Sequence, residues 1–202
     1  MANPRREEHY FSDAPSVASR PAGVTLALPD LRLELVTDRG VFSAGHIDPG
    51  TKLLLLEAPP PPPTGSLLDL GCGYGPMALT LASRSPGATV WAVDVNERAR
   101  HLTAANAAAA GLPVRVVAPS DVPAEERFAV IWSNPPIRIG KAALHDLLTT
   151  WLHRLEPSGH AYLVVQKHLG ADSLATWLGD RGHRVRRLGS RMGYRLLEVA
   201  AS

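Results

Sequence analysis

The sequence is poor in cysteine, in aromatic residues and in net charge. One of its 202 residues is a cysteine, 5% are aromatic, and the formal net charge is +2. The lone Cys72 excludes an internal disulfide and supplies no group of thiolates for a metal, so no metal site is expected. The small net charge excludes the overall basic character that marks many nucleic-acid-binding proteins.

Long hydrophobic runs are absent as well. The longest aliphatic cluster, 53–56, is far shorter than the ~20 residues that a membrane-spanning helix requires. Residues 1–12 are polar and contain no apolar segment of a signal peptide. We therefore expect a cytoplasmic protein that does not contact membranes, with one sizeable core and room for a small appendage.

The appendage is predicted to begin with a polar arm and a hairpin. Within the arm of residues 1–22, the aromatic stretch His9-Tyr10-Phe11 either anchors the arm or covers a pocket. Apolar and polar residues alternate over 24–36 around a central Pro-Asp turn, which predicts an antiparallel β-hairpin. Residues 41–42 are expected to form a further short strand.

A helix and a proline run complete this first part. Asp48 and Pro49 suit the cap and first residue of a helix that runs to about Ala58. The five prolines of 59–63 predict a stiff polyproline spacer, with a docking site for an SH3-like partner as the alternative. We therefore divide the chain into an N-terminal part, 1–63, and a main domain, 64–202.

The main domain alternates predicted strands and helices. The expected strands are 66–70, 89–93, 114–117, 128–132, 160–166, 183–188 and 194–200, and the expected helices are 76–84, 96–110, 141–155 and 171–179. Pro157-Ser158-Gly159 is expected to end the third helix. Only a short turn joins the last two strands, so they must pair antiparallel. The pattern predicts an α/β fold: a doubly wound, Rossmann-like, seven-stranded sheet with an antiparallel terminal strand, plus the small N-terminal β-hairpin.

The first strand of this domain ends in a glycine-rich turn. Its residues after Asp69 and Leu70 are Gly71, Cys72, Gly73, Tyr74 and Gly75. Glycine adopts backbone angles that other residues avoid, and its missing side chain lets a ligand approach the main chain. Pro76 suits the first turn of a helix, whose N-terminal N–H groups can bind a polar ligand.

Polar residues also follow the next three strands. Ligands of open α/β sheets bind beyond the carboxyl ends of the strands, so these residues are candidates for a binding site. Asp94 either accepts hydrogen bonds from ribose hydroxyls or caps the following helix. Asp121 either binds an adenine amino group or is a simple turn residue.

The fourth strand leads into Asn134-Pro135-Pro136. The two prolines stiffen the loop, although a rigid turn alone would also explain them. The Asn134 side-chain oxygen and the Pro135 carbonyl can both accept hydrogens from an amino group. An exocyclic amine on a base is a poor nucleophile, and two acceptors aimed at its hydrogens support the charge that develops during attack.

These motifs resemble those of class I S-adenosylmethionine-dependent methyltransferases. The acid followed by GxGxG at 69–75 is similar to their cofactor loop, Asp94 to their ribose acid, and 134–136 to the motif of enzymes that methylate planar amino nitrogens. A NAD-dependent dehydrogenase would instead space its glycines as GxGxxG.

A closer resemblance covers nearly the whole chain. It is to the 16S rRNA guanine-N2 methyltransferase family in its short single-domain form, since longer relatives carry an additional methyltransferase-like domain. It rests on segments 9–11, 40–43, 47–48, 69–76, 94–99, 134–141, 166–167 and 193–194. The resemblance implies methyl transfer from S-adenosylmethionine to the guanine N2 amine, with 16S rRNA or the small ribosomal subunit as partner. The sequence does not give the oligomeric state, and a monomer is favoured.

The resemblance also implies roles for individual residues. The implied catalytic residues are Asn134 and Pro135. The implied cofactor-binding residues are Asp69, Gly71, Cys72, Gly73, Tyr74, Gly75, Asp94, Val95, Asp121 and Asn134. The implied substrate-binding residues are Phe42, Pro136, Ile137, Arg138, Lys141 and Lys167.

One departure from the wider amino-methyltransferase pattern concerns the target base. Ile137 stands where many members have an aromatic residue that stacks on the base, so Phe42, Tyr10 or aliphatic groups must replace it. The remaining alternatives are methylation of adenine N6 or protein glutamine, and a non-catalytic cofactor- or RNA-binding protein with this fold.

Positive charge is concentrated near the C-terminus and after Asn-Pro-Pro. Between residues 180 and 195 one acid stands against six arginines: 181, 184, 186, 187, 191 and 195. These arginines either face RNA or line the solvated face of edge strands. Likewise, Arg138 and Lys141 either contact RNA phosphates or solvate the start of a helix.

Overall fold

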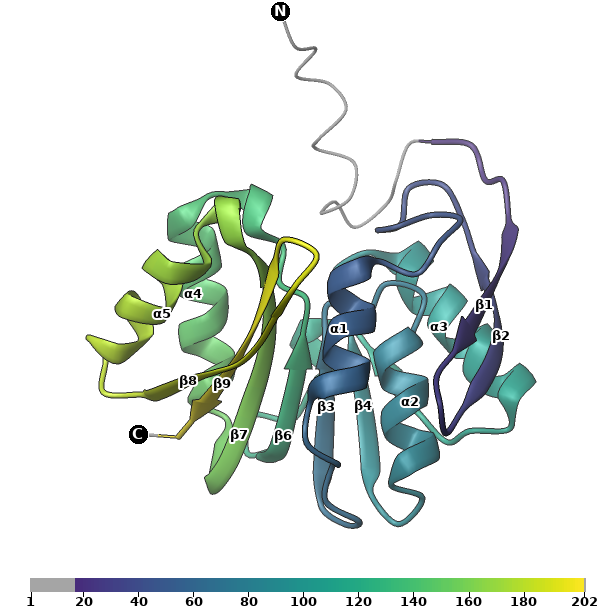
Figure 1. Ribbon diagram of the computed structural model, residues 1–202. Helices are drawn as coiled ribbons and strands as arrows, with labels where there is room; N and C mark the ends of the chain where they lie inside the picture. The colour runs from purple at the N-terminus through teal and green to yellow at the C-terminus, as the bar shows by residue number, and fades with distance from the viewer. Residues whose placement is uncertain (1–16, 202) are drawn as a thin grey trace, which may run out of the picture.

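The computed structural model describes residues 17–201, and seven of its strands form one sheet in the order β5-β4-β3-β6-β7-β9-β8 (Figure 1). The strands are β3 (Ser66–Leu70), β4 (Thr89–Val93), β5 (Arg115–Val117), β6 (Phe128–Ser133), β7 (Leu155–Gln166), β8 (Arg184–Arg191) and β9 (Tyr194–Ala200). The pairs from β5 to β7 are parallel, whereas β9 is antiparallel to both β7 and β8. The predicted doubly wound sheet with its antiparallel terminal strand is confirmed.

Helices cover both faces of this sheet. They are α1 (Pro49–Glu57), α2 (Pro76–Arg84), α3 (Glu97–Ala110), α4 (Lys141–Leu152) and α5 (Ala171–Gly179), with short 3-10 helices η3 (Pro119–Asp121), η4 (Ile137–Ile139) and η5 (Lys167–Leu169). Leu67 of β3 belongs to the core that contains α1, α2 and α3, and Leu68 to the core that contains α4 and α5. Both faces of β3 are therefore buried, which explains its continuous apolar run.

The predicted N-terminal hairpin is formed by β1 (Ala22–Ala27) and β2 (Arg32–Thr37), which pair antiparallel. Its apolar side chains join the core shared by α1 to α3. The Asn106 side chain of α3 accepts a hydrogen bond from Val36 N at 2.8 Å and donates to Val36 O at 2.9 Å. It also donates to Tyr74 O at 2.8 Å, so one amide joins the hairpin to the glycine-rich turn.

Helix α1 packs against the sheet rather than standing apart from it. Asp48 caps the helix as expected, because its Oδ1 accepts a hydrogen bond from Thr51 N at 2.9 Å. Leu54 and Leu55 are fully buried in the same core as Leu67. The proline run thus connects two packed elements, and the division of the chain at residue 63 stays a prediction.

Two predictions from the sequence were wrong. Residues 41–46 form turns instead of a strand, because Ser43 and Gly45 adopt positive φ angles of 59° and 86°. Helix α4 ends at Leu152, and β7 already begins at Leu155. Pro157 therefore does not end the helix: it lies in an irregular stretch of β7, between the pairs Phe128–Leu155 and Val130–His160, where a missing N–H is tolerated.

Within residues 17–201, no helix is long and apolar enough to span a membrane. The stretch around Tyr10 lies outside the described residues.

Candidate active site

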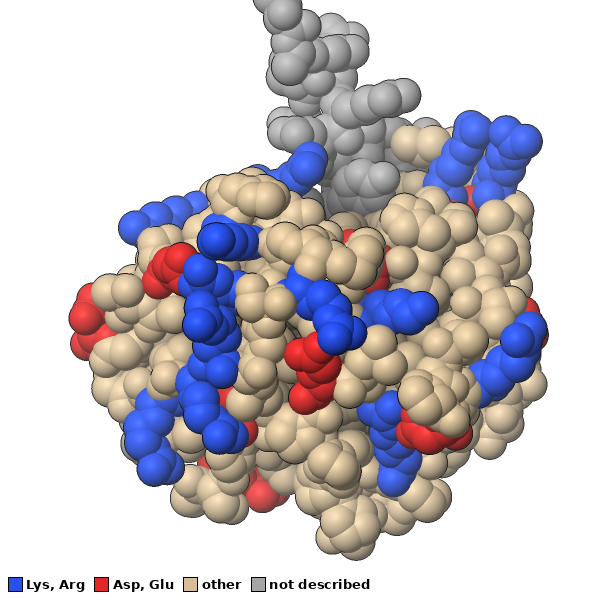
Figure 2. Space-filling view, viewed as in Figure 1, with Lys and Arg blue, Asp and Glu red and all other residues tan. Residues whose placement is uncertain are grey.

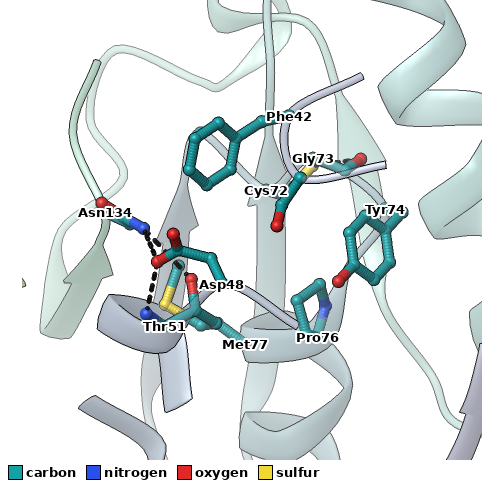
Figure 3. Close-up of a pocket in the computed structure, with 11 residues that line it drawn as sticks. Phe42, Asp48, Thr51, Cys72, Gly73, Tyr74, Pro76, Met77 and Asn134 are labelled. Atoms are coloured by element: carbon teal, nitrogen blue, oxygen red, sulfur yellow. Dashed lines mark hydrogen bonds between the residues drawn. The ribbon is translucent and has the colours of Figure 1, made fainter. Parts of the chain in front are cut away.

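A narrow cleft opens at the carboxyl ends of β3 and β6, with a cavity volume of about 20 Å³ (Figure 3). Its walls are residues 71–74 of the glycine loop, the start of α2, the start of α1 with its cap, the turn that carries Phe42, and Asn134. The cleft thus lies at the edge of the sheet where ligands of this architecture bind, and it joins the two motifs that the sequence singled out.

The glycines of the loop share a backbone conformation but differ in the space around them. All three have positive φ angles: 81° at Gly71, 59° at Gly73 and 95° at Gly75. A Cβ on Gly75 would lie 2.9 Å from Leu79 Cδ1 and 3.0 Å from Thr103 Cγ2, so packing requires glycine there. A Cβ on Gly71 would meet no atom of the described chain within 4 Å. Gly71 is therefore a position where a ligand can approach the main chain.

Asp69 lies beneath this loop and is fully buried. Its Oδ2 accepts a hydrogen bond from Ala78 N at 2.8 Å, which ties β3 to α2. Burial raises the pKa of Asp69 to about 8, and the nearby Asp94 carboxylate adds to this effect. Its visible role is to support the loop, and direct contact with a cofactor stays a prediction.

Cys72 and Tyr74 also hold the loop in place. The Cys72 side chain is buried and accepts a hydrogen bond from Thr103 Oγ1 at 3.5 Å. Burial raises the pKa of this thiol well above its ordinary value, which argues against a reactive thiolate. The Tyr74 hydroxyl donates to His46 O at 2.9 Å and so fixes the turn that carries Phe42.

Asp94 follows β4 beside the glycine loop. Its Oδ2 accepts a hydrogen bond from Gly73 N and its Oδ1 one from Asn96 N, both at 2.9 Å. Asn96, rather than Asp94, caps α3 by accepting a hydrogen bond from Ala99 N. Burial raises the pKa of Asp94. Each carboxylate oxygen keeps a lone pair, so the group can still accept hydrogen bonds from a ligand.

Five of the predicted cofactor residues, Asp69, Gly75, Asp94, Val95 and Asp121, are not among the residues that line the cleft. Val95 follows Asp94 directly and is exposed. Asp121 is exposed in η3, where its Oδ1 accepts a hydrogen bond from Ser120 Oγ at 3.0 Å. Because β5 is the neighbour of β4, Asp121 and Asp94 follow adjacent strands at the same edge of the sheet.

Asn134 closes the opposite side of the cleft. Its Nδ2 donates to Asp48 Oδ1 at 2.8 Å and to Thr51 Oγ1 at 3.2 Å. Figure 3 shows the nitrogen directed towards these two residues of α1 and its cap. Asp48 Oδ2 also accepts a hydrogen bond from the Tyr194 hydroxyl at 3.1 Å. Sequence reasoning found Asp48 only as a helix cap and missed its contact with Asn134.

The residues after Asn134 lead from the cleft to a second cavity. The Pro135 carbonyl accepts a hydrogen bond from Ile137 N at 2.8 Å, which leaves it a second lone pair. Ile137 packs against the core of α4 and α5 and lines a second cavity of about 190 Å³ together with Lys141. The structure therefore does not bring Ile137 into the cleft, and the half-buried Pro136 connects the two regions.

Phe42 is the aromatic side chain that the structure brings to the mouth of the cleft. It is 49% exposed, and Figure 3 shows its ring over the opening between Asn134 and Gly73. Asn96 Nδ2 donates to Gly40 O at 2.8 Å and steadies the turn from the side of α3. The other proposed stacking residue, Tyr10, is not among the described residues.

Basic side chains form two groups, one on the segments after β6 and β7 and one farther along the chain. Arg138, Lys141 and Lys167 are exposed on the segments that follow β6 and β7. Figure 2 shows a larger group of Lys and Arg over the region of α5 and β8, with acids among them.

Several arginines of this larger group have partners on the protein itself. Arg186 pairs with Glu198 at 2.7 Å, Arg191 with Glu57 at 3.8 Å, and Arg195 with Asp172. The Arg181 guanidinium stacks on the Trp177 ring at 4.1 Å. These pairings favour the structural interpretation of those arginines, in which they protect an edge strand.

Comparison with known proteins identifies the family. Residues 32–198 match the model of the methyltransferase small domain. The chain belongs to this family. It is 36% identical to the uncharacterized protein YbxB of Bacillus subtilis over 196 residues, which are 95% of this chain and 98% of that protein.

Relatives of the chain include longer proteins. The ribosomal RNA small subunit methyltransferase C of Stutzerimonas stutzeri is 35% identical over 187 residues, 85% of this chain and 56% of that protein. The T. thermophilus 16S rRNA N2 G1207 methyltransferase, solved with AdoMet and guanosine, superposes with a TM-score of 0.74. It is 25% identical, over 93% of this chain and 52% of the other. The chain thus spans about half the length of these methyltransferases.

The residues present fit S-adenosylmethionine, the methyl donor that this fold implies. Gly71 leaves open space above the main chain, and Asp94 offers carboxylate oxygens at the end of the adjacent strand. Main-chain groups and a carboxylate suit the amino-acid and ribose parts of such a molecule. Among residues 17–201, no group of three or more His, Cys, Asp or Glu could hold a metal ion.

Proposed function

We propose that this protein transfers a methyl group from S-adenosylmethionine to the exocyclic N2 amine of a guanine in 16S rRNA. The observation that carries the proposal is the orientation of the Asn134 amide. Its nitrogen donates to Asp48 and Thr51, so its oxygen is the atom that remains to accept a hydrogen from a substrate. An acceptor held in this way suits an amine and does not suit a carbonyl or a carboxylate.

Asn134 and Pro135 are the proposed catalytic residues. The Asn134 oxygen and the second lone pair of the Pro135 carbonyl accept the two hydrogens of the amine. Both acceptors support the positive charge that develops on the nitrogen during attack, and they hold it in line with the incoming methyl group. S-adenosylmethionine would supply the methyl group from its sulfonium centre and leave as S-adenosylhomocysteine, and the methylated nitrogen would then lose one proton to water.

The opposite wall of the cleft is the proposed cofactor site. Gly71 and its loop neighbours bind the methionine part through main-chain carbonyls, because the N–H groups of Gly71 and Cys72 already donate to Val93 O. Asp94 accepts hydrogen bonds from the ribose hydroxyls, and Asp121 accepts one from the adenine amino group. Asp69 supports the loop from below through Ala78 N.

The assignment to guanine N2 is supported by the relatives whose names specify small-subunit rRNA and, in one case, the N2 position. Ile137 turns away from the cleft, so Phe42 is the proposed stacking partner of the base. Enzymes that methylate adenine N6 or glutamine commonly carry an aromatic residue at position 137, and its absence makes those substrates the second choice.

The proposed partner is 16S rRNA or the small ribosomal subunit, which would place the protein in the cytoplasm. Arg138, Lys141 and Lys167 are the proposed phosphate contacts beside the cleft. Each phosphate contact releases counterions, so the affinity for RNA should fall steeply as salt concentration rises. If the target guanine is paired, it must first leave its stack at a cost of a few kcal/mol.

Transfer of tritiated methyl groups tests the proposal. The purified protein is incubated with labelled cofactor and either 16S rRNA or 30S particles from a strain that lacks the enzyme. We expect incorporation with at least one of these substrates and almost none with Asn134→Ala, which should still bind the cofactor. Cofactor binding without transfer to either substrate would favour a non-catalytic protein.

A further inference from the structure

Asp48 lies at the centre of a buried hydrogen-bond network that joins four elements of the fold. The residue is 7% exposed and precedes α1. Its Oδ1 accepts hydrogen bonds from Thr51 N and from Asn134 Nδ2. Its Oδ2 accepts one from the Tyr194 hydroxyl of β9, and this hydroxyl accepts one from Gln166 Nε2 of β7 at 2.9 Å. One carboxylate thus connects α1, the loop after β6, β7 and β9.

The acceptor oxygens of Asp48 fix which way the Asn134 amide points, because three donors surround them. An ionised carboxylate can only accept hydrogen bonds, so it favours the amide nitrogen and repels the amide oxygen. A flipped amide would place two acceptor oxygens 2.8 Å apart at the position where Nδ2 now meets Asp48 Oδ1. The observed network therefore keeps the Asn134 oxygen directed away from Asp48.

The second oxygen of Asp48 is held by a close packing contact. A Cβ on Gly50 would lie 2.5 Å from ring atoms of Tyr194, so glycine at position 50 lets this ring reach α1. Burial raises the pKa of Tyr194, so its hydroxyl keeps the proton that it donates to Asp48. The carboxylate is consequently held at both oxygens.

We propose that Asp48 is a positioning residue that acts through Asn134: it holds the amide with its oxygen towards the amine, and Tyr194 holds Asp48. This inference rests on the proposed function, because it assigns how the acceptor of that reaction is oriented. It gives the helix cap a second task that the Asp-Pro pattern does not reveal.

Substitutions of Asp48 can separate this task from capping. Asp48→Ser keeps a good N-cap for Thr51 N, but its shorter side chain does not reach Asn134 or Tyr194. Asp48→Asn keeps an oxygen that can accept from both Thr51 N and Asn134. We expect Asp48→Ser to lower kcat ~10–100-fold, less than the ~100–1,000-fold of losing an oriented polar group itself, and Asp48→Asn to recover most of that loss. Tyr194→Phe should lower kcat by a smaller factor.

A double-mutant cycle tests whether Asp48 acts through Asn134. If it does, Asp48→Ser should lower kcat little in a protein that already carries Asn134→Ala. Equal factors in both backgrounds would overturn the inference. A large loss of cofactor affinity in Asp48→Ser with normal kcat at saturation would also overturn it, because Asp48 would then be a cofactor contact.

A second readout does not depend on the substrate. The Asn134 side-chain NH₂ signals, assigned by their absence in Asn134→Ala, report directly on the bonds to Asp48. Nuclear magnetic resonance of Asp48→Ser should show these signals shifted and exchanging faster with solvent, and unchanged signals would contradict the inference. If the wild type methylates another amine, the proposed substrate fails, and the same kinetic series then tests Asp48 with that amine.

Discussion

The two sides of the cleft are built in different ways. On the glycine-loop side, hydrogen bonds join Asp69 to Ala78 and Asp94 to Gly73, which are 9 and 21 residues apart. On the opposite side, Asn134 and Tyr194 both bond to Asp48, from 86 and 146 residues further along the chain. The first side is made by one strand-turn-helix unit and its neighbour, whereas the second exists only once the whole sheet has assembled.

We propose that the glycine-loop side binds the cofactor and that the Asn134 side orients the acceptor. A change in the glycine-loop side should act first on cofactor affinity. A change in the Asn134 side should act first on the rate of methyl transfer at saturating cofactor. The following predictions test that separation.

The largest expected effect is that of Asn134→Ala. It removes the oxygen that we propose accepts a hydrogen of the amine, and the loss of one such oriented group lowers kcat ~100–1,000-fold. The cofactor dissociation constant should change far less. Single-turnover transfer of tritiated methyl groups measures the rate, and calorimetry measures binding. A cofactor affinity that falls as steeply as the rate would contradict separate roles for the two sides of the cleft.

Asp94→Ala should show the opposite pattern. Hydrogen bonds to a charged group contribute ~1.5–3 kcal/mol, so the cofactor dissociation constant should rise ~10–100-fold. The rate at saturating cofactor should stay close to that of the wild type. Asp94→Asn, which keeps one acceptor oxygen, provides the matched control and should lose less affinity. A reduced kcat with normal affinity would contradict this role of Asp94.

Two glycine substitutions distinguish packing from ligand binding within the loop. Gly75→Ala forces a Cβ to within 2.9 Å of Leu79 at a φ of 95°. Strain and overpacking together should lower the free energy of unfolding by ~2–3 kcal/mol. Gly71→Ala carries strain but no clash, so it should cost ~1 kcal/mol and weaken cofactor binding instead. Urea unfolding and calorimetry measure the two effects, and equal stability losses would refute the distinction.

The smallest expected effect is a pH dependence from Asp69. Its pKa is about 8 in the folded protein against an ordinary 3.8, so the folded state binds this proton more tightly. Its contribution to stability is fully present below the ordinary pKa and is lost as pH rises through the folded pKa. Between pH 7 and pH 8 the wild type should lose ~1 kcal/mol that Asp69→Asn keeps. Urea unfolding at both pH values measures this, and parallel curves would contradict it.

Much of the fold could be predicted from the sequence because local signals agree with it. Strands β3 and β4 and helix α2 begin and end at the predicted residues, where apolar runs meet glycine and proline. The prediction that Pro157 ends a helix was wrong. Proline ends helices in most contexts, whereas here it lies in an irregular part of β7. The predicted strand at Val41-Phe42 was wrong because two apolar residues suggest a strand, although the backbone around Ser43 turns.

The sequence predicted the residues of the candidate site but only some of the contacts between them. Asp94 and the glycine loop follow adjacent strands, so the strand pattern alone brings them together. The contact between Asp48 and Asn134 depends on how α1 packs across the sheet, which no spacing encodes. The outward position of Ile137 likewise follows from its packing against the core of α4 and α5.

The most direct test of the central claim is mass spectrometry of the modified nucleoside. 16S rRNA, free and within 30S particles from a strain lacking the enzyme, is treated with the wild type or with Asn134→Ala and then digested. We predict N2-methylguanosine in at least one wild-type sample and its near absence with Asn134→Ala. N6-methyladenosine, or an equal yield of N2-methylguanosine from both proteins, would contradict the account.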